Sequence, residues 1–490
     1  MRLSNREIAD NLEECLNFLG GTKYLINPFF RVSKATPEQM QQYKFINLKF
    51  PRIKAIFSVF ISIPTNFLLA ILYISLSIML RCQYTLYNSR IAKSDILFLS
   101  HAIGDNITKN KGDQFFSLMP EYVSNLGLQT TIIYTNHFKL KYFKISKLLF
   151  KKTSKVNSCV IPKLLKPFEN IKFIYIACLL SFRCFKSGVI LWHNDPVKSA
   201  LLIRGSVKFL NRGTYNNYLI LTRVKEYYIK SSAHTIVMTF EGHSYEHYVA
   251  VGIKSSQESK VVFYQHSPIV PDHFGIEYFL KSYHGNLHIL TTGSIYKSYF
   301  ESISTRPNYI VIGSDKSKGI SASINYHTKN KILIAPEGTI QATHNFLKLI
   351  LDLCETNSKY EFILRLHPNL TRSLKIIVFI NKLNRFSNFS VSSETLSTDL
   401  AKSNYIFYRS SAVGVQALAS AAIPVFYSDV GQNGLNVLSL TTQKFPVACN
   451  SREVLELLAN SNREIPIKKR IEILDQLLAK IHYEKLNFLT

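Results

Sequence analysis

The stretch SNYIFYRSSAVGVQALASAAIPVFYS, residues 403–428, contains one complete unit of an α/β fold. Tyr405 to Tyr408 and Ile423 to Phe426 are short apolar runs with the length of buried strands, and small residues from about Ala412 onward separate them. A strand, a helix and a second strand in this order favour parallel strands in one sheet. The stretch therefore predicts an α/β fold.

The same alternation of short apolar runs and helical stretches continues from Ser94 onward. In the first half it predicts strands at Ile96–Ser100, Thr130–Tyr134, Val189–Trp192, Thr235–Phe240, Val261–Gln265 and His288–Thr291. In the second half it predicts strands at Ile332–Ala335, Phe362–Leu366, Phe389–Val391, Tyr405–Tyr408 and Ile423–Phe426. Two tandem Rossmann-like domains with a cleft between them are the simplest architecture for this pattern.

A stretch rich in Ser, Gly and Lys, Val311 to Lys331, reads as the linker between the two series of strands. We therefore expect an N-terminal helical segment at residues 1–93, a first Rossmann-like domain at 94–318, a second at 319–450 and C-terminal helices at 451–490.

Composition suggests an anionic partner and a reducing compartment. The 490 residues carry a formal net charge of +27, which is typical of proteins that meet nucleic acid, an anionic membrane face or a phosphorylated substrate. The seven cysteines form no CxxC pair, which indicates a cytosolic protein and no zinc site. No aromatic and basic recognition motif supports a nucleic-acid partner.

Two stretches indicate a membrane surface. Ala55 to Leu80 is uncharged over a length that could span a bilayer, and it could equally be a re-entrant element or a helix packed on the next domain. Basic residues flank both of its ends, which favours an embedded element that does not span. Lys139 to Lys155 interleaves lysines with Leu, Phe and Ile, as in helices that bind lipid surfaces, although a solvated basic helix has the same pattern.

Polar residues follow two predicted strands of the second half. His367 and Pro368 end the run KYEFILRLHPNLT, and Pro368 cannot continue a strand. Ser410 and Ser411 follow another strand and precede a helix, whose free amides and positive dipole end suit a phosphate. Ligands bind at the carboxyl edge of open α/β sheets, so His367 and the serines could share one anion. A backbone-satisfied histidine and an ordinary capped helix are the alternatives.

A carboxylate follows a predicted strand of the first half. Glu241 precedes Gly242, which permits a tight turn, so Glu241 could project into the cleft as a general base. The alternative is a helix-capping acid, because Glu241 and Glu246 both suit the first turn of the next helix. His266 ends the neighbouring strand on the same side.

Several familiar nucleotide motifs are missing from the sequence. There is no GxGxxG and no GxxxxGK[ST], which argues against dinucleotide and P-loop sites. There is also no Asp-x-Asp, so a transferase of this kind would have to stabilise its leaving phosphate with side chains and a helix terminus.

These residues resemble the GT-B glycosyltransferases that use CMP-activated nonulosonic or ulosonic acids (sialic, legionaminic and pseudaminic acids and Kdo) to build bacterial surface polysaccharides. That family carries an Asp/Glu-Gly motif for the base, a His-Pro motif, and a Ser/Thr-Ser motif that holds the nucleotide phosphate. The matching positions are Glu241 with Gly242, His367 with Pro368, and Ser410 with Ser411. The resemblance covers about Ser94 to Val447, and it departs from the family at Phe240, where some relatives carry a second acid.

The resemblance implies inversion at the anomeric carbon without a metal and without a cofactor other than the CMP-sugar donor, so that stabilisation of the departing CMP matters most. It makes His367 and Ser411 the stabilising groups and places Glu337, and less strongly Glu394, near the nucleotide. Arg365 and Arg409 are interpreted as structural. On the acceptor side we expect His101, Asp105, Asp195 and His266, with Asp195 as the reserve candidate for the base.

The implied function is transfer of a nonulosonic or ulosonic acid to a growing capsule or O-antigen glycan, free or lipid-linked, at the cytoplasmic side of the inner membrane. Two alternatives stay open. A CDP-glycerol type glycerophosphotransferase has the same fold, His-Pro motif and paired serines, but usually shows Asp-Tyr where this chain has Tyr408 and Arg409. A non-catalytic, membrane-bound assembly protein could keep the fold with an inactive site.

Overall fold

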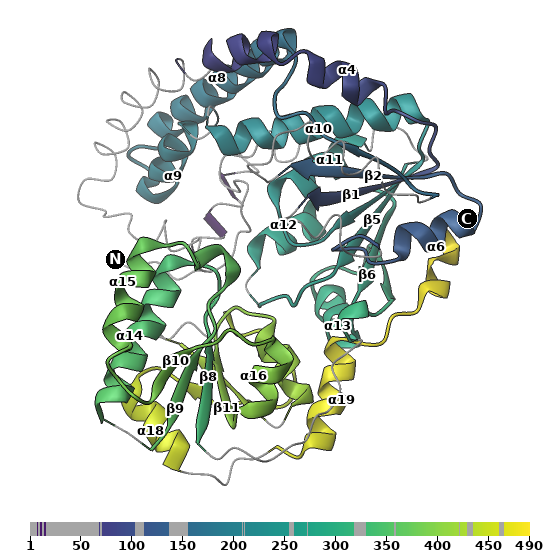
Figure 1. Ribbon diagram of the computed structural model, residues 1–490. Coiled ribbons are helices and arrows are strands. Elements are labelled where there is room, and N and C mark those ends of the chain that lie inside the picture. The colour runs from purple at the N-terminus through teal and green to yellow at the C-terminus, as the bar shows by residue number, and fades with distance from the viewer. Residues whose placement is uncertain are drawn as a thin grey trace.

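The chain forms two parallel β-sheets covered by helices (Figure 1). The computed structural model describes residues 71–102, 112–136, 155–207, 211–253, 259–271, 273–317, 330–356, 359–420, 422–428, 435–459 and 465–490, with residues 7, 10, 11, 14, 15, 68 and 209. Within these residues one sheet has seven strands in the order β3-β2-β1-β4-β5-β6-β7, and the other has six in the order β10-β9-β8-β11-β12-β13. The predicted α/β fold with two Rossmann-like domains is confirmed.

All strand pairs in both sheets are parallel. The first sheet consists of β1 (Ile96–Ala102), β2 (Thr130–Asn136), β3 (Asn157–Val160), β4 (Thr235–Thr239), β5 (Lys260–Gln265), β6 (Leu287–Thr291) and β7 (Asn308–Val311). The second consists of β8 (Lys331–Ala335), β9 (Glu361–Leu364), β10 (Phe389–Val391), β11 (Tyr405–Tyr408), β12 (Ile423–Tyr427) and β13 (Val447–Ala448).

Helices connect the strands and cover the sheets. The first domain has α4 (Cys82–Asn88), α6 (Met119–Asn125), α8 (Pro167–Ile190), α9 (Pro196–Ser206), α10 (Arg212–Ser231), α11 (Ser244–Ile253), α12 (Phe274–Ser282) and α13 (Ser294–Ile303). The second has α14 (Ile340–Thr356), α15 (Leu374–Leu383), α16 (Leu396–Lys402), α17 (Val413–Gln416) and α18 (Ser451–Ala459), and α19 (Ile467–Leu477) follows. Short 3-10 helices occupy Asp315–Ser317, Pro368–Leu370, Ala417–Ala419 and Tyr483–Leu489.

One predicted strand is wrong. Val189–Trp192 is the end of α8 and the turn after it, because the apolar run belongs to a helix whose buried positions recur every three to four residues, at Phe173, Ala177, Leu180, Cys184 and Gly188. The sequence reading also missed β3, β7 and β13, which have four residues or fewer and lie at or beside sheet edges.

The C-terminal residues return to the first domain (Figure 1). Helix α19 lies between α13 of the first domain and the segment α17 to Ala419 of the second. Beyond it the backbone runs along the end of the first sheet, where the Ala479 amide donates to the Thr292 carbonyl over 2.8 Å and the Ser314 amide donates to the Ala479 carbonyl over 2.9 Å. The C-terminal residues therefore complete the first domain.

A single hydrophobic core continues from one domain into the other. It combines Ile269 and Val270 of the first domain, Tyr408 and Val415 of the second, and Leu477 of α19. A separate core fills the other face of the second sheet, around residues such as Phe346, Ile350 and Phe362. The shared core places the end of β11 and the start of α17 at the junction between the domains.

Several predictions fall outside the described residues. These are Asp105, all of Lys139–Lys155 except its last residue, residues 318–329 of the expected linker, and most of Ala55–Leu80 before residue 71. Of the linker, Val311 belongs to β7. Residues 71–79 form a helix that leads into α4.

Candidate functional site

The Glu-Gly motif lies where β4 and β5 end side by side, since Thr239 pairs with Tyr264 in the parallel register. The Glu241 carboxylate is nearly buried and contacts two imidazoles: Oε1 is 2.8 Å from His266 Nε2, and Oε2 is 3.0 Å from His243 Nε2. The Ser267 hydroxyl donates to Oε1 over 3.3 Å. The structure thus gathers Glu241 and His266, as the sequence suggested, and adds His243 and Ser267.

Gly242 makes the tight turn that the sequence predicted. Its φ is +72°, and a Cβ at this position would overlap the ring of His273. A side chain is therefore excluded both by the backbone conformation and by the imidazole above it.

Glu246 caps the following helix. Its carboxylate accepts from the backbone amides of Glu241 (3.1 Å) and His243 (2.9 Å) and from the Thr239 hydroxyl (2.8 Å). His243 stands at the N-cap and Glu246 at the third helical position, so this is half of a capping box. Glu246 therefore binds the amides of the turn, and the Glu241 carboxylate contacts the two histidines.

Burial controls the protonation of this cap. It raises the pKa of Glu246 to about 7, with the neighbouring His243 acting in the opposite direction and Glu241 acting in the same one. A group that titrates near neutrality therefore holds the two backbone amides that shape the Glu-Gly turn.

His101, predicted on the acceptor side, lies buried at the end of β1 in a chain of hydroxyl groups. Its Nε2 is 2.6 Å from the Tyr245 hydroxyl and its Nδ1 is 2.6 Å from the Thr135 hydroxyl, which donates to the Ser100 carbonyl. Because the Thr135 hydroxyl donates to the Ser100 carbonyl, it accepts from Nδ1–H of His101, and burial raises the pKa of Tyr245, so its hydroxyl stays protonated beside Nε2. This chain connects His101 through Tyr245 to the helix that Glu246 caps.

In the second domain, the residues that follow β8, β9 and β11 lie together, because β8 pairs with both other strands. A Cβ on Gly338 would lie 2.8 Å from Nδ1 of His367, so the imidazole rests directly on this glycine. Nη1 of Arg409 is 3.3 Å from Oε1 of Glu337. Burial lowers the pKa of His367, which therefore offers a neutral imidazole at pH 7.

The paired serines stand where β11 ends, but the helix after them is shorter than expected. Helix α17 has four residues, and Ala412 takes the N-cap position without a side-chain bond. The Ser411 hydroxyl accepts from the Val413 amide over 3.3 Å, and both serines are half-exposed. A single turn of helix follows the serines, so any phosphate site here would depend mainly on side chains.

Two other charged residues of this domain have structural partners. Nη1 of Arg365 donates to Asp399 Oδ2 over 2.7 Å and to the Glu394 carbonyl over 2.8 Å, which fixes the loop before α16. The exposed Glu394 carboxylate lies 3.6 Å from Lys402. Arg365 thus has the structural role expected of it, whereas Arg409 stands beside Glu337 at the strand ends.

The placement of Asp195 differs from the prediction. It follows a helix, not a strand, and it is the N-cap of α9, where its Oδ1 accepts from the Lys198 amide over 3.0 Å. Its other oxygen pairs with the Lys198 ammonium at 3.1 Å. The error follows directly from the misread strand at Val189–Trp192.

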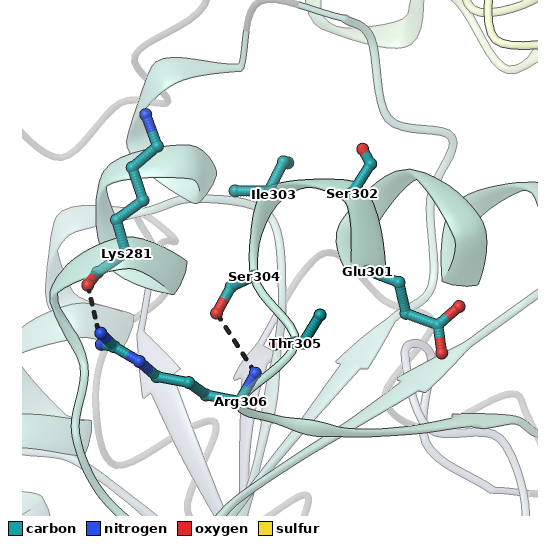
Figure 2. A pocket seen from close by; sticks show the side chains of 7 residues that line it. All are labelled: Lys281, Glu301, Ser302, Ile303, Ser304, Thr305 and Arg306. Carbon is teal, nitrogen blue, oxygen red and sulfur yellow. Dashed lines mark hydrogen bonds between the residues drawn. The ribbon is translucent and has the colours of Figure 1, made fainter.

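A cavity of about 420 Å³ lies elsewhere, at the ends of α12 and α13 (Figure 2). It is lined by Lys281, Glu301, Ser302, Ile303, Ser304, Thr305 and Arg306. Arg306 closes one side by donating to the Lys281 carbonyl over 3.2 Å. These helices end where the next strands begin, so the cavity is at the edge of the first sheet opposite to Glu241. Within the described part of the chain, no group of three or more His, Cys, Asp or Glu residues could hold a metal ion.

No family model matches the sequence, and no curated protein matches it. Solved structures do resemble it at low identity. A UDP-GlcNAc 2-epimerase from Methanocaldococcus jannaschii superposes with a TM-score of 0.43 and 11% identity, over 77% of this chain and 98% of its own. A glycosyltransferase from Streptomyces nogalater gives 0.41 and 11%, over 80% and 98%. A lipopolysaccharide outer core galactosyltransferase gives 0.42 and 7%, over 80% and 98%. At these scores the resemblance carries no statement about substrate or activity.

Proposed function

We propose that this protein is an inverting glycosyltransferase that takes its sugar from a nucleotide-activated donor without a metal. The observation that carries the proposal is the Glu241 carboxylate, held between His266 and His243 at the carboxyl edge of the first sheet while Glu246 serves as the helix cap. A carboxylate held between two imidazoles at this edge of the sheet is suited to act as a general base.

In the proposed reaction, Glu241 accepts the proton of an acceptor hydroxyl as its oxygen attacks the anomeric carbon of the donor. The bond between that carbon and the phosphate oxygen breaks, and the nucleotide leaves as an anion. The imidazoles of His243 and His266 keep the Glu241 carboxylate oriented, and either ring can share the transferred proton with it through its hydrogen bond.

The nucleotide would bind at the second group, made of His367, Ser410 and Ser411, with Pro368 and Glu337 at its border. A neutral His367 can donate one N–H to the leaving phosphate, and the two hydroxyls add further donors. The core shared by Ile269 and Val270, which follow His266, and by Tyr408 and Val415, which flank the serines, supports the view that both groups serve one substrate.

We further propose that the donor is a CMP-activated nonulosonic or ulosonic acid, such as sialic, legionaminic or pseudaminic acid or Kdo, and that the acceptor is a growing capsule or lipopolysaccharide glycan. The support is the order of the three motifs, Glu-Gly, His-Pro and Ser-Ser, each located after a strand. The protein would work at the cytoplasmic face of the bacterial inner membrane, which the uncharged stretch Ala55–Leu80 supports.

A nucleotide panel tests the donor. Thermal stabilisation of the full chain is compared for CMP, UMP, GDP and CDP-glycerol, with CMP expected to give the largest shift. Selective stabilisation by UMP or GDP would refute the CMP assignment, and selective stabilisation by CDP-glycerol would replace the sugar donor by a glycerophosphate donor.

Variants of the second group test the nucleotide site. His367→Ala and Ser411→Ala should each weaken CMP binding by about 1.5 to 3 kcal/mol, the cost of losing a hydrogen bond to a charged group. The melting temperature without ligand should stay nearly unchanged, and Ser390→Ala, which changes an exposed serine of the neighbouring β10, should bind CMP normally. Full CMP affinity in both site variants would remove the assignment.

A further inference from the structure

Helix α8 presents an exposed face that is apolar and basic at the same time. Three aromatic side chains, Phe168, Tyr175 and Phe182, recur two turns apart and are exposed by 77%, 65% and 66%. The other exposed residues on this face are Ile171, Lys172, Cys178, Leu179, Arg183, Lys186, Val189 and Ile190. Large apolar side chains in such a row are unusual on a surface that meets only water.

The opposite face of α8 is fixed to the protein. Ser199 of α9 donates to the Gly188 carbonyl over 2.7 Å, and the Cys184 thiol donates to the Leu202 carbonyl over 3.1 Å. A Cβ on Gly188 would lie 2.7 Å from the side chain of Ile203, so the two helices are in close contact. Although α8 is long and apolar enough to cross a bilayer, only one of its faces is available to lipid. Its geometry therefore suits a helix that lies in the plane of a membrane surface.

The charges of α8 favour an anionic partner. The acid of this helix, Glu169, is engaged inside the protein, where the fully buried Arg223 pairs with Glu169 and with Glu226. The exposed residues of the outward face of α8 include Lys172, Arg183 and Lys186 and no Asp or Glu. Basic side chains next to an aromatic row match a surface of anionic lipid headgroups over acyl chains.

A second helix extends this face. Residues 71–79 expose Ile71, Leu72, Ile78 and Met79. The ring of Tyr73 stacks on Tyr215 with centroids 4.4 Å apart, and Phe173 of α8 contacts the same ring edge-on at 5.3 Å. The two helices thus both pack on the ring of Tyr215, and Figure 1 shows them close together beyond α10.

We propose that the exposed face of α8, continued by residues 71–79, docks on the surface of an anionic bilayer with its axis parallel to the membrane. The inference is independent of the catalytic proposal, because it concerns neither strand edge nor any residue of the two candidate groups. Helix α8 lies outside Ala55–Leu80 and Lys139–Lys155, the two stretches in which the sequence pattern indicated lipid contact, whereas residues 71–79 belong to the first of them.

The single tryptophan of the chain, Trp192, provides a direct probe. It is half-buried in the turn after α8, where its amide donates to the Val189 carbonyl. Full-length protein is mixed with vesicles of phosphatidylcholine alone or with phosphatidylglycerol, prepared with and without brominated acyl chains. We expect a blue shift of the emission and quenching by the brominated lipid, both stronger with phosphatidylglycerol. Protein that co-floats with the vesicles without quenching of Trp192 would overturn the proposal, because another surface would then make the contact.

A variant with Phe168→Ser, Tyr175→Ser and Phe182→Ser should lose about tenfold or more in the quenching-derived vesicle affinity, since binding scales with the inserted apolar area. The control carries Leu374→Ser and Val378→Ser, which replace exposed apolar residues of α15 in the second domain and should bind vesicles as the unchanged protein does. Because all five side chains are exposed, both proteins should fold.

Two outcomes would contradict the proposal. Equal quenching in the aromatic variant and the control would show that the face does not touch lipid. Efficient cross-linking of Cys178 between two chains, with no vesicle binding, would mean that a second copy of the protein covers the face.

Discussion

The two oxygens of Glu241 have different histidine partners, whereas the Glu246 carboxylate accepts from backbone amides at the start of the helix that follows. The two acids of the segment FEGHSYEH, Glu241 and Glu246, thus have different partners. Glu246 satisfies the backbone amides of the turn, so a change at Glu241 should leave the turn in place.

Glu241→Gln should therefore separate catalysis from folding. A general base acts only in the transition state, so we expect donor binding and melting temperature to stay close to those of the unchanged protein while turnover falls by about 10²- to 10⁴-fold. The measurement is steady-state transfer with the donor identified by the nucleotide panel. Glu301→Gln, which changes an exposed carboxylate of the same domain, is the matched control. Normal turnover in Glu241→Gln together with an inactive Asp195→Asn would move the base to Asp195.

The buried Glu246 should make stability depend on pH in an unusual direction for a carboxylate. Its pKa of about 7 lies above the ordinary value of 4.5, so the folded state binds its proton more tightly than the unfolded state. Its contribution is greatest below pH 4.5 and is lost as the pH rises toward 7, by a total of about 3 kcal/mol. Urea unfolding between pH 5 and pH 8 measures this effect.

The test is the difference between the unchanged protein and Glu246→Gln. The variant keeps an amide that can accept one bond from the turn but cannot titrate, so its stability should fall less steeply across this range. Parallel pH profiles for the two proteins would show that Glu246 does not titrate there.

At the scale of elements, the backbone of residues 478–482 approaches the first sheet so closely that glycine is required. A Cβ on Gly313 would overlap the carbonyl oxygen of Lys480, and the residue has φ +87°. Gly127 has a similar φ of +90° with open space around it. Comparing alanine variants of Gly313 and Gly127 therefore separates the cost of the left-handed backbone, which both share, from the cost of the close contact, which only Gly313 has.

Gly313→Ala should therefore destabilise the protein by more than Gly127→Ala, which carries only the cost of a left-handed backbone, about 1 kcal/mol. The extra cost should appear as cleavage of the C-terminal segment in limited proteolysis, because residues 478–490 detach first. Equal stability of the two variants would mean that the segment adjusts freely.

Ten of the thirteen strands in the described residues, all except β3, β7 and β13, could be predicted from the sequence because their apolar runs are continuous and flanked by polar residues. The end of helix α8 was wrongly predicted as a strand, since its last turn resembles a short strand when it is considered without the earlier turns of the helix. Strands β3 and β13 are too short to give a pattern, and they exist because a neighbouring strand offers its edge.

The candidate residues Glu241, His266, His367, Ser410 and Ser411 could be selected from the sequence because each follows a strand. Their partners could not. The contact of Glu241 with His243 depends on the Gly242 turn, and the ring of His367 rests on Gly338, which lies in the loop after β8. The capping role of Glu246 could be predicted locally, because an acid three residues after the N-cap is typical of a capping box. The sequence alone could not choose between Glu246 and Glu241, since both suit the first turn of the helix.

At the scale of the whole molecule, α19 joins the domains through one core. Leu477 is fully buried in the hydrophobic cluster that includes residues of both domains. Leu353 of α14 is equally buried, in the separate core of the second domain. Substitution of Leu477 should therefore loosen both domains, and substitution of Leu353 only the second.

Leu477→Ala and Leu353→Ala should each cost about 2 to 5 kcal/mol of unfolding free energy. Hydrogen exchange should distinguish them: the first variant should exchange faster in strands of both sheets, and the second only in strands β8 to β13. Acceleration confined to one sheet in both variants would show that the shared core does not couple the domains.

The return of the C-terminus to the first domain also has a consequence for biosynthesis. Strand β7 is complete at Val311, but the segment that covers its end lies in residues 465–490, so it leaves the ribosome only after the entire second domain. At ordinary translation rates this delay is roughly ten to thirty seconds. During that time the nascent first domain exposes Ile312 and Leu290 without the C-terminal residues Ile481 and Leu486 that pack in the same cluster. A ribosome-bound chain stalled before residue 465 should accordingly recruit chaperones through its first domain, whereas the released protein should not.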